Sequence, residues 1–434
     1  MPERLPMTLR LYRGLTSAAT PLAPYLLSHR LKRGKEHPRR LLERQGESAI
    51  GRPPGPLVWM HGASVGEMLA VIPLIERIRA QNFNVLMTSG TVTSAALAEQ
   101  RLPRGVIHRF VPLDTPRYVA RFLDHWRPNV ALFVESDLWP NMIMASAERR
   151  IPLILVNGRI SERSFKRWHY FPRTIASLLE RFDLCLAQSP DDAARYAGLG
   201  APRIGTTGNL KLDVPAPSAD NEKLELIRMA TAGRTIVAAA STHAGEETAV
   251  IDAHRRLKHT FPGLLTIIAP RHPERGAGIA DIASVSGLGA ALRSRGELPF
   301  AETDIYVADT MGELGLVYRL APIVFMGGSL ISHGGQNPIE AAKLGVAILH
   351  GPHVWNFKDV YSALDAAGAA ELVADPGKLA VRVGAWLKDV PARQAVSAAA
   401  LKAMETLAGA LERTMQALDP YFVQLQLERR STDA

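Results

Sequence analysis

The sequence predicts an α/β protein made of two Rossmann-like domains that face a cleft, and three observations lead to this prediction. The chain has 434 residues, which is more than one hydrophobic core usually organises. Apolar strand-like runs alternate with helix-like runs, as expected of parallel sheets that carry helices on both faces. A polar, proline-rich stretch at residues 213–222 interrupts the alternation and predicts a linker between two doubly wound halves.

Aliphatic runs separated by amphipathic or alanine-rich segments predict the individual elements in order. The strands predicted before the linker are Leu57–His61, Asn84–Thr88, Ile107–Pro112, Val130–Glu135, Pro152–Asn157, Asp183–Gln188 and Arg203–Thr207. Those predicted after it are Thr235–Ala240, Leu264–Ala269, Asp304–Val307, Ile323–Met326, Val346–His350 and Glu371–Val373. We therefore expect an N-terminal domain over residues 37–212, a C-terminal domain over 223–400 and a helical tail over 401–434.

Composition limits the class of protein and of partner. Hydrophobic residues make up 47% of the chain and aromatic residues 6%, which fits a soluble α/β protein. The net charge of +9 favours an anionic partner, such as a nucleotide, a nucleic acid or an acidic membrane. The single cysteine, Cys185, rules out an internal disulfide and lies in a strand-like run that predicts burial. The 13 histidines have no paired metal spacing, so no metal site is predicted.

The N-terminal segment, residues 1–36, differs from the rest of the chain. Its apolar part, Met7 to Leu27, is interrupted by arginines and prolines, and a basic block over residues 29–40 follows. A membrane-spanning helix needs about 20 mostly apolar residues, so a span is not supported. Apolar residues beside basic ones instead predict attachment to an anionic membrane surface. The alternative is a first helix that packs on the N-terminal domain.

A glycine-rich stretch in the second half predicts a nucleotide site. The apolar strand that ends at Met326 is followed by glycines at 327, 328, 334 and 335. A helix is then predicted, with Asn337 as its cap, Pro338 at its first position and Glu340 in its first turn. Free N–H groups at a helix start suit a phosphate, and Glu340 could accept hydrogen bonds from sugar hydroxyls. An ordinary strand-to-helix turn is the alternative.

Three polar motifs follow predicted strands of the first half. Glu67, in the first turn of the next predicted helix, could act as a general base, although Ser64 and Glu67 also fit a capping box. Glu135 and Asp137 end another strand, where the alternative is helix capping by Ser136 or Asp137. A third motif contains Lys211, which could stabilise negative charge or could simply be solvated.

Further polar loops follow strands of the second half. Pro270 and Arg271 come first, and an arginine there can hold a phosphate. His243 and His272 lie in similar loops and could be plain hydrogen-bonded histidines. The stretch Met311-Gly312-Glu313 also follows a strand and opens a predicted helix.

Taken together, these motifs resemble a known family, the 3-deoxy-D-manno-octulosonic acid (Kdo) transferases of lipid A biosynthesis. The resemblance runs from about Arg39 to Phe357 and begins with Arg39-x-x-x-Glu43-Arg44-x-Gly46. The other motifs that carry it, in order, are His61-Gly-Ala-Ser-Val-Gly-Glu67, Glu135-Ser-Asp-Leu-Trp-Pro-Asn141, Gly208-Asn-Leu-Lys211, Pro270-Arg-His-Pro-Glu-Arg275, Asp309-Thr-Met-Gly-Glu-Leu314, Gly327-Gly-Ser-Leu330, Asn337-Pro-Ile-Glu-Ala-Ala342 and Gly351-Pro-His-Val-Trp-Asn-Phe357.

The resemblance implies a GT-B glycosyltransferase that moves Kdo from CMP-Kdo to a lipid A precursor, lipid IVA, in lipopolysaccharide core biosynthesis. It implies an inverting, metal-independent reaction without a cofactor, at the cytoplasmic face of the inner membrane. It also implies that Glu67 is the general base and that Glu135 and Lys211 stabilise the transition state. The implied CMP contacts are Pro270, Arg271, Met311, Gly312, Glu313, Asn337, Pro338, Ile339 and Glu340.

The sequence departs from the family in one place and leaves two rival functions. Family members often carry a cleaner apolar anchor, and the prolines of this N-terminus disfavour a spanning helix. One rival is another GT-B enzyme, such as a nucleotide-sugar epimerase, which would not need a basic apolar N-terminus. The other is a non-catalytic basic protein that binds membrane or nucleic acid. The ordered polar loops argue against the second rival, so no nucleic-acid partner is expected.

Overall fold

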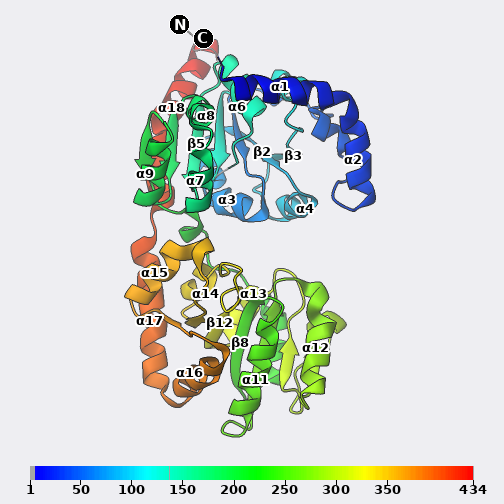
Figure 1. Cartoon of the computed structure of the whole chain (residues 1–434), viewed down its shortest axis with the longest axis vertical. Helices are drawn as coiled ribbons and strands as arrows, with labels where there is room; N and C mark the ends of the chain where they lie inside the picture. The colour runs from blue at the N-terminus through cyan, green and yellow to red at the C-terminus, as the bar shows by residue number, and fades with distance from the viewer. Residues whose placement is uncertain (1–4, 136, 434) are drawn as a thin grey trace. The chain divides into compact units, whose positions relative to one another are not determined.

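The chain forms two compact units in the computed structural model, which describes residues 5–135 and 137–433, with side chains to 427 (Figure 1). Unit 1 comprises Met1–Val214 and Ala408–Ala434, and unit 2 comprises Pro215–Leu407. The boundary between Val214 and Pro215 falls within the predicted linker, 213–222.

Unit 1 is built on a seven-stranded parallel sheet with the order β3-β2-β1-β4-β5-β6-β7. Its strands are β1 Leu57–His61, β2 Asn84–Ser89, β3 Ile107–Phe110, β4 Val130–Val134, β5 Leu153–Gly158, β6 Leu184–Ala187 and β7 Ile204–Thr206. Its helices are α1 Met7–Ala19, α2 Ala23–Lys32, α3 Val65–Ala80, α4 Val92–Arg101, α5 Pro116–Trp126, α6 Pro140–Glu148, α7 Glu162–Trp168, α8 Pro172–Leu179, α9 Pro190–Gly198 and α18 Ala410–Asp433. Short 3₁₀ turns are η1 Thr20–Leu22, η2 Leu41–Gln45 and η3 Leu210–Leu212.

Two hydrophobic cores cover the two faces of this sheet. Trp59 and Phe133 lie on one face and pack against side chains of α5, α6, α8 and α9. Met60 and Leu132 lie on the opposite face and pack against α3 and α18. Successive strand residues point to opposite faces, so the near-continuous aliphatic runs seen in the sequence are what a sheet covered on both faces requires.

The predicted tail, residues 401–434, is not a separate element. Residues up to Leu407 complete α17 in unit 2, whereas α18 belongs to unit 1, where it packs beside α3 (Figure 1). Met415, Leu418 and Phe422 of α18 are buried in the core of unit 1. Because those side chains complete the cover of one sheet face, unit 1 needs the end of the chain as well as its beginning.

Unit 2 repeats the architecture with the strand order β10-β11-β9-β8-β12-β13-β14, again parallel. Its strands are β8 Thr235–Thr242, β9 Leu264–Pro270, β10 Ala290–Leu292, β11 Ile305–Val307, β12 Ile323–Met326, β13 Ala347–His350 and β14 Ala370–Leu372. Its helices are α10 Asn221–Ala230, α11 Glu246–Lys258, α12 Gly276–Val285, α13 Leu314–Leu320, α14 Ile339–Lys343, α15 Lys358–Ala366, α16 Pro376–Lys388 and α17 Val390–Leu407. Its 3₁₀ turns are η4 Pro273–Arg275, η5 Arg293–Arg295 and η6 Trp355–Phe357.

One face of this second sheet carries a core formed with α11, α12 and α16. Every strand predicted from the sequence is present, with ends that differ by at most two residues, and the prediction of two Rossmann-like α/β domains is confirmed. The edge strand β10 is the element that the sequence did not predict. It is short and lies in a run of glycine, alanine and leucine that lacks the β-branched residues typical of strands.

The N-terminal segment forms two helices that dock on unit 1 by one face only. Leu9 of α1 and Leu27 of α2 are buried. Leu11, Leu15 and Tyr25 on the same helices remain exposed. The segment therefore packs on the domain, and attachment to a membrane through the apolar surface that remains uncovered stays a prediction.

Candidate active site

Loops that follow β1 and β4 meet at the point where the strand order of the unit 1 sheet reverses. β1 pairs with β4, with His61 opposite Phe133 near their carboxyl ends. Glu67 lies at the start of α3 after β1, and Glu135 directly follows β4. In open parallel sheets, ligands bind beyond the carboxyl ends of strands at such a switch point. The structure thus brings the two predicted carboxylates together where a ligand is expected.

Glu67 combines a capping role with the features of a base. Ser64 caps α3 and accepts the Glu67 N–H at 3.3 Å. The carboxylate bonds to Ser64 Oγ at 2.8 Å and to the Ala63 N–H at 2.7 Å, one residue before the cap. Burial, and then repulsion from Glu135, raises the pKa of the Glu67 carboxyl. A carboxylate with a raised pKa binds a proton more strongly, which suits a general base.

Lys211 forms an ion pair with Glu135, with Nζ 2.5 Å from Oε1. Only 20% of the lysine side chain and 12% of the glutamate side chain is exposed. Asn209 Oδ1 accepts the Lys211 N–H at 3.0 Å and thereby fixes the turn η3 that carries the lysine. The alternative of a solvated lysine is therefore wrong. The ion pair holds the Glu135 carboxylate in a fixed position at the end of β4.

Asn157, at the end of β5, links the two members of this pair and was not among the predicted site residues. Its Nδ2 donates to Glu135 Oε1 at 3.3 Å, and its Oδ1 accepts the Leu210 N–H at 2.9 Å. Asn157 is fully buried and, like Glu135, has a left-handed backbone, with φ 55° against 62°. The Asn157-Gly158 pair directly after a strand is a local signal that could have drawn attention to this residue.

The capping role considered for Asp137 is wrong, and Ser136 lies outside the described residues. Helix α6 begins at Pro140 with Trp139 at its cap, and the Trp139 side chain accepts no hydrogen bond from the helix. The carboxylate of Asp114 accepts the N–H groups of Asn141 and Met142 instead, at 3.1 and 3.0 Å. Only the tertiary fold brings Asp114 to that helix start. Asp137 lies close enough to Glu67 for its charge to raise the pKa of the Glu67 carboxyl.

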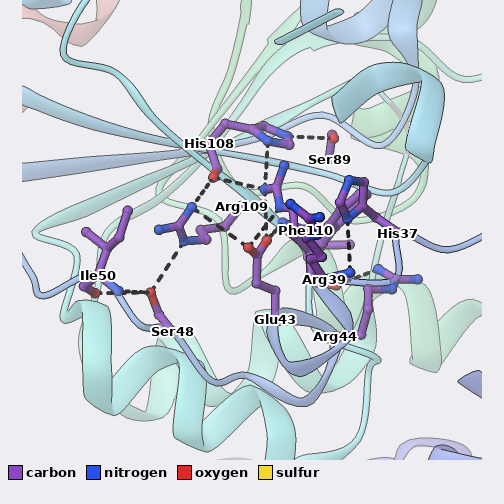
Figure 2. Close-up of polar contacts among 12 residues, drawn as sticks. His37, Arg39, Glu43, Arg44, Ser48, Ile50, Ser89, His108, Arg109 and Phe110 are labelled. Atoms are coloured by element: carbon purple, nitrogen blue, oxygen red, sulfur yellow. Dashed lines mark hydrogen bonds and ion pairs between the residues drawn. The ribbon is translucent and has the colours of Figure 1, made fainter. Parts of the chain in front are cut away.

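The early motif of the sequence fastens the turn η2 to β3. Figure 2 shows Glu43 beside Arg109 and Phe110, and the Phe110 N–H donates to Glu43 Oε2 at 2.7 Å. Arg40 forms a bidentate ion pair with the same carboxylate, with both contacts at 2.9 Å. A side chain at Gly46 would meet the Tyr118 carbonyl oxygen, so the motif needs glycine there. Glu43 and Gly46 therefore have a structural explanation.

A serine–histidine pair in the same cluster is not a nucleophile and its base. Ser89 Oγ lies 2.9 Å from His108 Nε2 (Figure 2). Arg40 Nη2 lies 3.1 Å from His108 Nδ1, and a guanidinium can only donate, so Nδ1 accepts. The neutral ring then carries its proton on Nε2 and donates it to Ser89. Burial and the neighbouring arginines lower the pKa of His108 to about 3, so this ring is a poor proton acceptor.

In unit 2, the glycine loop after β12 is already bound by a protein carboxylate. Glu246, at the start of α11, accepts the N–H groups of Gly328, Ser329 and Leu330 at 2.6, 2.9 and 3.0 Å. It also accepts the His243 N–H at 3.0 Å. These three N–H groups of the loop are therefore not free to bind a phosphate. Glu246 was missed because its partners lie far away in the sequence.

The residues from Asn337 to Glu340 begin α14, which starts at Ile339 with Pro338 at the cap, one residue later than predicted. Asn337 Oδ1 accepts the Ile339 N–H at 3.1 Å, so asparagine still closes the turn. Glu340 is partly buried, and this burial raises the pKa of its carboxyl. The helix is only five residues long, so its dipole contributes less than a long helix would.

The stretch from Met311 to Glu313 precedes α13, which begins at Leu314 with Glu313 at its cap. Met311 is 67% exposed. Glu313 is held by Lys223 at 2.7 Å and by Arg293 at 3.0 Å. Its hydrogen bonds to Arg293 and Lys223 outweigh burial and lower its pKa to about 2. The backbone and Met311 are therefore the parts of this stretch that are open to a ligand.

Pro270 and Arg271 lie at the carboxyl end of β9, beside the end of β8. The Arg271 N–H donates to the Thr242 carbonyl at 2.9 Å, whereas its side chain is exposed. The strand order of this second sheet reverses between β8 and β12. The loop that carries Arg271, the loop after β8 and the glycine loop thus border the switch point of unit 2, where a nucleotide is expected.

Comparison with known proteins decides the family. Residues 35–214 match the family model of 3-deoxy-D-manno-octulosonic-acid transferase (kdotransferase). The chain is 38% identical over 384 residues to a probable mitochondrial 3-deoxy-D-manno-octulosonic acid transferase of Arabidopsis thaliana, covering 86% of each chain. It is 33% identical over 389 residues to the 3-deoxy-D-manno-octulosonic acid transferase of Haemophilus influenzae, covering 88% of this chain and 91% of the other.

The chain belongs to the Kdo transferase family. It is therefore a glycosyltransferase, as the resemblance implies, and the rival interpretations as an epimerase or a non-catalytic binding protein are set aside.

Solved structures support the GT-B fold of this Kdo transferase. A glycosyltransferase from Rickettsia africae has a TM-score of 0.61 at 11% identity, with 85% of this chain and 99% of that chain covered. The UDP-GlcNAc 2-epimerase from Neisseria meningitidis has a TM-score of 0.56 at 13% identity, with 83% and 100% covered. At such low identity the likeness concerns the fold alone.

Two properties of this Kdo transferase concern metals and membrane spans. Among residues 5–135 and 137–433, no three His, Cys, Asp or Glu side chains are arranged to hold a metal ion. Within the same described residues, every helix is too short or too polar to cross a membrane.

Proposed function

We propose that this Kdo transferase moves Kdo from CMP-Kdo to lipid IVA, with inversion at the anomeric carbon, in lipopolysaccharide core biosynthesis. One observation carries the proposal. In a member of this family, the Glu67 carboxylate and the Glu135–Lys211 pair stand together at the switch point of one sheet. A base and a fixed charge pair are what transfer between a sugar hydroxyl and a glycosyl phosphate requires.

In the proposed reaction, an acceptor hydroxyl oxygen attacks the anomeric carbon of Kdo. The bond between that carbon and the phosphate oxygen breaks, and its electron pair leaves with CMP. The hydroxyl proton passes to Glu67, whose raised pKa favours its uptake. Positive charge develops on the sugar ring in the transition state, as in glycoside hydrolysis. Glu135 can stabilise this charge, and Lys211 holds the Glu135 carboxylate in place.

We assign the donor nucleotide to unit 2 and the acceptor to unit 1. Arg271 supports the donor assignment because its exposed guanidinium lies at the ligand-binding edge of the second sheet. Glu340 supports it as a partly buried hydrogen-bonding group. The proposed CMP contacts also include Pro270, the backbone from Met311 to Glu313, and the start of α14 from Asn337.

The test is incubation of the purified enzyme with CMP-Kdo and lipid IVA, with mass spectrometry of the lipid product. We expect the lipid mass to rise by whole Kdo units, and the number of units reports how many transfers occur. The anomeric configuration of the product, measured by NMR, tests inversion. An enzyme that binds CMP but leaves lipid IVA unchanged would contradict the proposed acceptor.

We also propose that the enzyme attaches to the cytoplasmic face of the inner membrane through α1 and α2. Exposed apolar side chains gather on these helices and on the turn η1 between them, namely Met7, Leu11, Leu15, Leu22, Tyr25 and Leu26. Lys32, Arg33 and Lys35 are exposed just beyond them. The turn before α8 adds exposed Tyr170 and Phe171, and Thr8 of α1 contacts Thr174 of α8 at 2.5 Å. Apolar side chains rimmed by basic ones suit an anionic lipid surface.

Vesicle flotation tests this attachment. Replacing Leu11, Leu15 and Leu22 with serine should abolish flotation with anionic vesicles while preserving the fold, because these side chains are exposed. Met229→Ser, an equally exposed apolar change in unit 2, is the control. High salt should release the unmodified enzyme, since each basic residue near an anionic leaflet contributes about 1 kcal/mol that salt screens. Equal flotation of the triple variant would contradict the assignment.

A further inference from the structure

Three histidines gather at the switch point of the second sheet. His243 follows β8, His272 follows β9, and His333 lies in the glycine-rich loop after β12. The three strands are neighbours in the order β9-β8-β12. The rings of His243 and His333 stack with centroids 3.9 Å apart and an angle of 37°. The His272 ring meets His243 edge-on, with centroids 5.9 Å apart.

The hydrogen bonds of His243 determine which of its nitrogens can meet a ligand. Its Nε2 lies 2.9 Å from Gln336 Nε2. An amide nitrogen only donates, so Nε2 of the neutral ring accepts and the proton sits on Nδ1. His243 therefore presents an N–H donor as a neutral ring and would gain a full positive charge by protonation at Nε2. His243 is largely buried, whereas His333 is exposed.

Two arginines approach His243, whereas the neighbouring carboxylates are bound to other groups. From the β9 loop come Arg271 and Arg275, and both lower the pKa of His243. The carboxylates on α11 are committed elsewhere, because Glu246 binds the glycine loop and Glu247 pairs with Arg275 at 3.2 Å. Glu274, on the same loop, lies 3.7 Å from His272.

A stacked imidazole pair beside two arginines is electrostatically unfavourable once it is protonated. Burial first, and then His333, His272 and the arginines, lower the pKa of His243 to about 4. An oxyanion placed against these rings would reverse the repulsion, because it attracts the proton that the cluster otherwise repels. The groups assembled at this point are thus suited to a ligand that carries negative charge.

We propose that His243, His272 and His333 form an oxyanion subsite that receives an acidic group of the donor nucleotide-sugar and takes up a proton when it is occupied. This inference rests on the proposed function, because it presumes that the donor binds unit 2. The acidic group is either the phosphate of CMP or the carboxylate of Kdo, and both present the same oxygen chemistry to an imidazolium.

The size of the linked effect follows from the titration of one histidine. If the anion restores His243 to the ordinary histidine pKa of about 6.5, its affinity rises roughly tenfold between pH 7.5 and pH 5.5. The sign is fixed by linkage, since a group whose pKa is higher in the complex favours the complex at low pH. Removing the imidazole removes this pH dependence.

The experiment is isothermal titration calorimetry of the full-length enzyme with CMP, cytidine and free Kdo, in EDTA-treated buffers of different ionisation enthalpy. We compare the unmodified enzyme with His243→Asn and His333→Asn. His259→Asn is the control, because this exposed histidine follows the C-terminal end of α11, about 20 Å along the helix from its start. Comparison with the variants removes the contribution of the phosphate's own titration.

We expect the unmodified enzyme to bind CMP or Kdo with net proton uptake. Both cluster variants should lose this uptake, and at pH 5.5 they should bind the ligand about tenfold more weakly than the unmodified enzyme. Cytidine should bind equally to all four proteins. Linkage with CMP assigns the subsite to the phosphate, and linkage with Kdo alone assigns it to the carboxylate. CMP binding without histidine-dependent proton uptake overturns the inference but leaves the proposed function standing. Failure of the unmodified enzyme to bind CMP at all overturns both.

Discussion

Replacing Glu67 with glutamine separates its two possible roles, because glutamine keeps the shape and part of the cap but cannot take a proton. The carboxylate makes two hydrogen bonds, to Ser64 Oγ and the Ala63 N–H. Glutamine can accept from the Ala63 N–H through its oxygen and donate to Ser64 Oγ through its NH2 group, so it exchanges bonds to a charged group for neutral ones. This exchange costs about 1 kcal/mol. In a domain of this size, that corresponds to a fall in Tm of about 2–4 °C.

At neutral pH, the raised pKa of Glu67 affects folding stability in the opposite sense and favours the glutamine variant. Because its pKa is higher in the folded protein than in the unfolded chain, ionisation of Glu67 lowers stability as pH rises through the interval between the two values. Glutamine cannot ionise and escapes this loss. We therefore expect the Tm of the variant, relative to that of the unmodified enzyme, to be higher at pH 7 than at pH 4.

Catalysis should respond far more strongly than stability. General-base catalysis typically contributes about 10²–10⁴-fold, or roughly 3–5 kcal/mol of the barrier. We expect kcat to fall by that factor while CMP affinity is unchanged. In the unmodified enzyme, kcat/KM should fall as pH drops through the raised pKa of Glu67, and the variant should lack this limb.

The assay is transfer from CMP-Kdo to lipid IVA by mass spectrometry, with thermal unfolding at pH 4 and pH 7 alongside. Glu76→Gln, the same chemical change at an exposed site on α3, is the matched control. If the folded Glu67→Gln enzyme turned over at nearly the normal rate, the carboxylate would be a helix cap and the base would lie elsewhere.

Three other changes test the surrounding framework. Asn157→Asp keeps the left-handed backbone but removes the N–H donor to Glu135, so kcat should fall at least about tenfold. The control, Asn129→Asp at the amino end of β4, should leave kcat unchanged in the same assay. Glu246→Gln leaves buried N–H groups of the glycine loop without an acceptor, and each such group lowers the free energy of unfolding by about 1–3 kcal/mol. Scanning calorimetry should therefore show a lower Tm. An unchanged Tm would mean that other bonds hold the loop. Arg271→Ala and Glu340→Ala should each weaken CMP binding in calorimetry without lipid present, and unchanged affinity in both would move the nucleotide elsewhere.

The local parts of the molecule could be predicted because they depend on neighbouring residues. Aliphatic runs such as Val130–Val134 are buried on both faces, which the sequence already requires of a parallel strand covered by helices. The Ser64 cap of α3 is equally local, because a serine before the first turn can bond only to N–H groups a few residues away. The resemblance implied the roles of Glu67, Glu135 and Lys211, which spacing alone left open.

The contacts that define the candidate site could not be predicted in this way. Asn157 joins Glu135 to the turn that carries Lys211, Asp114 caps a helix that begins at Pro140, and Glu246 fills the glycine loop. Each of these contacts joins segments that are far apart in the chain, and no periodicity records which loop ends beside which.

The sequence by itself determined the alternation of strands and helices, the two-domain division and the positions of the polar loops, since hydrophobic period and turn chemistry act over a few residues. Tertiary structure decided which polar groups are free to meet a ligand. Three N–H groups of the glycine loop are occupied by Glu246, and Lys211 pairs with Glu135 rather than with solvent. A hydrogen bond or an ion pair depends on distance in space, and only the folded chain brings those partners within that distance.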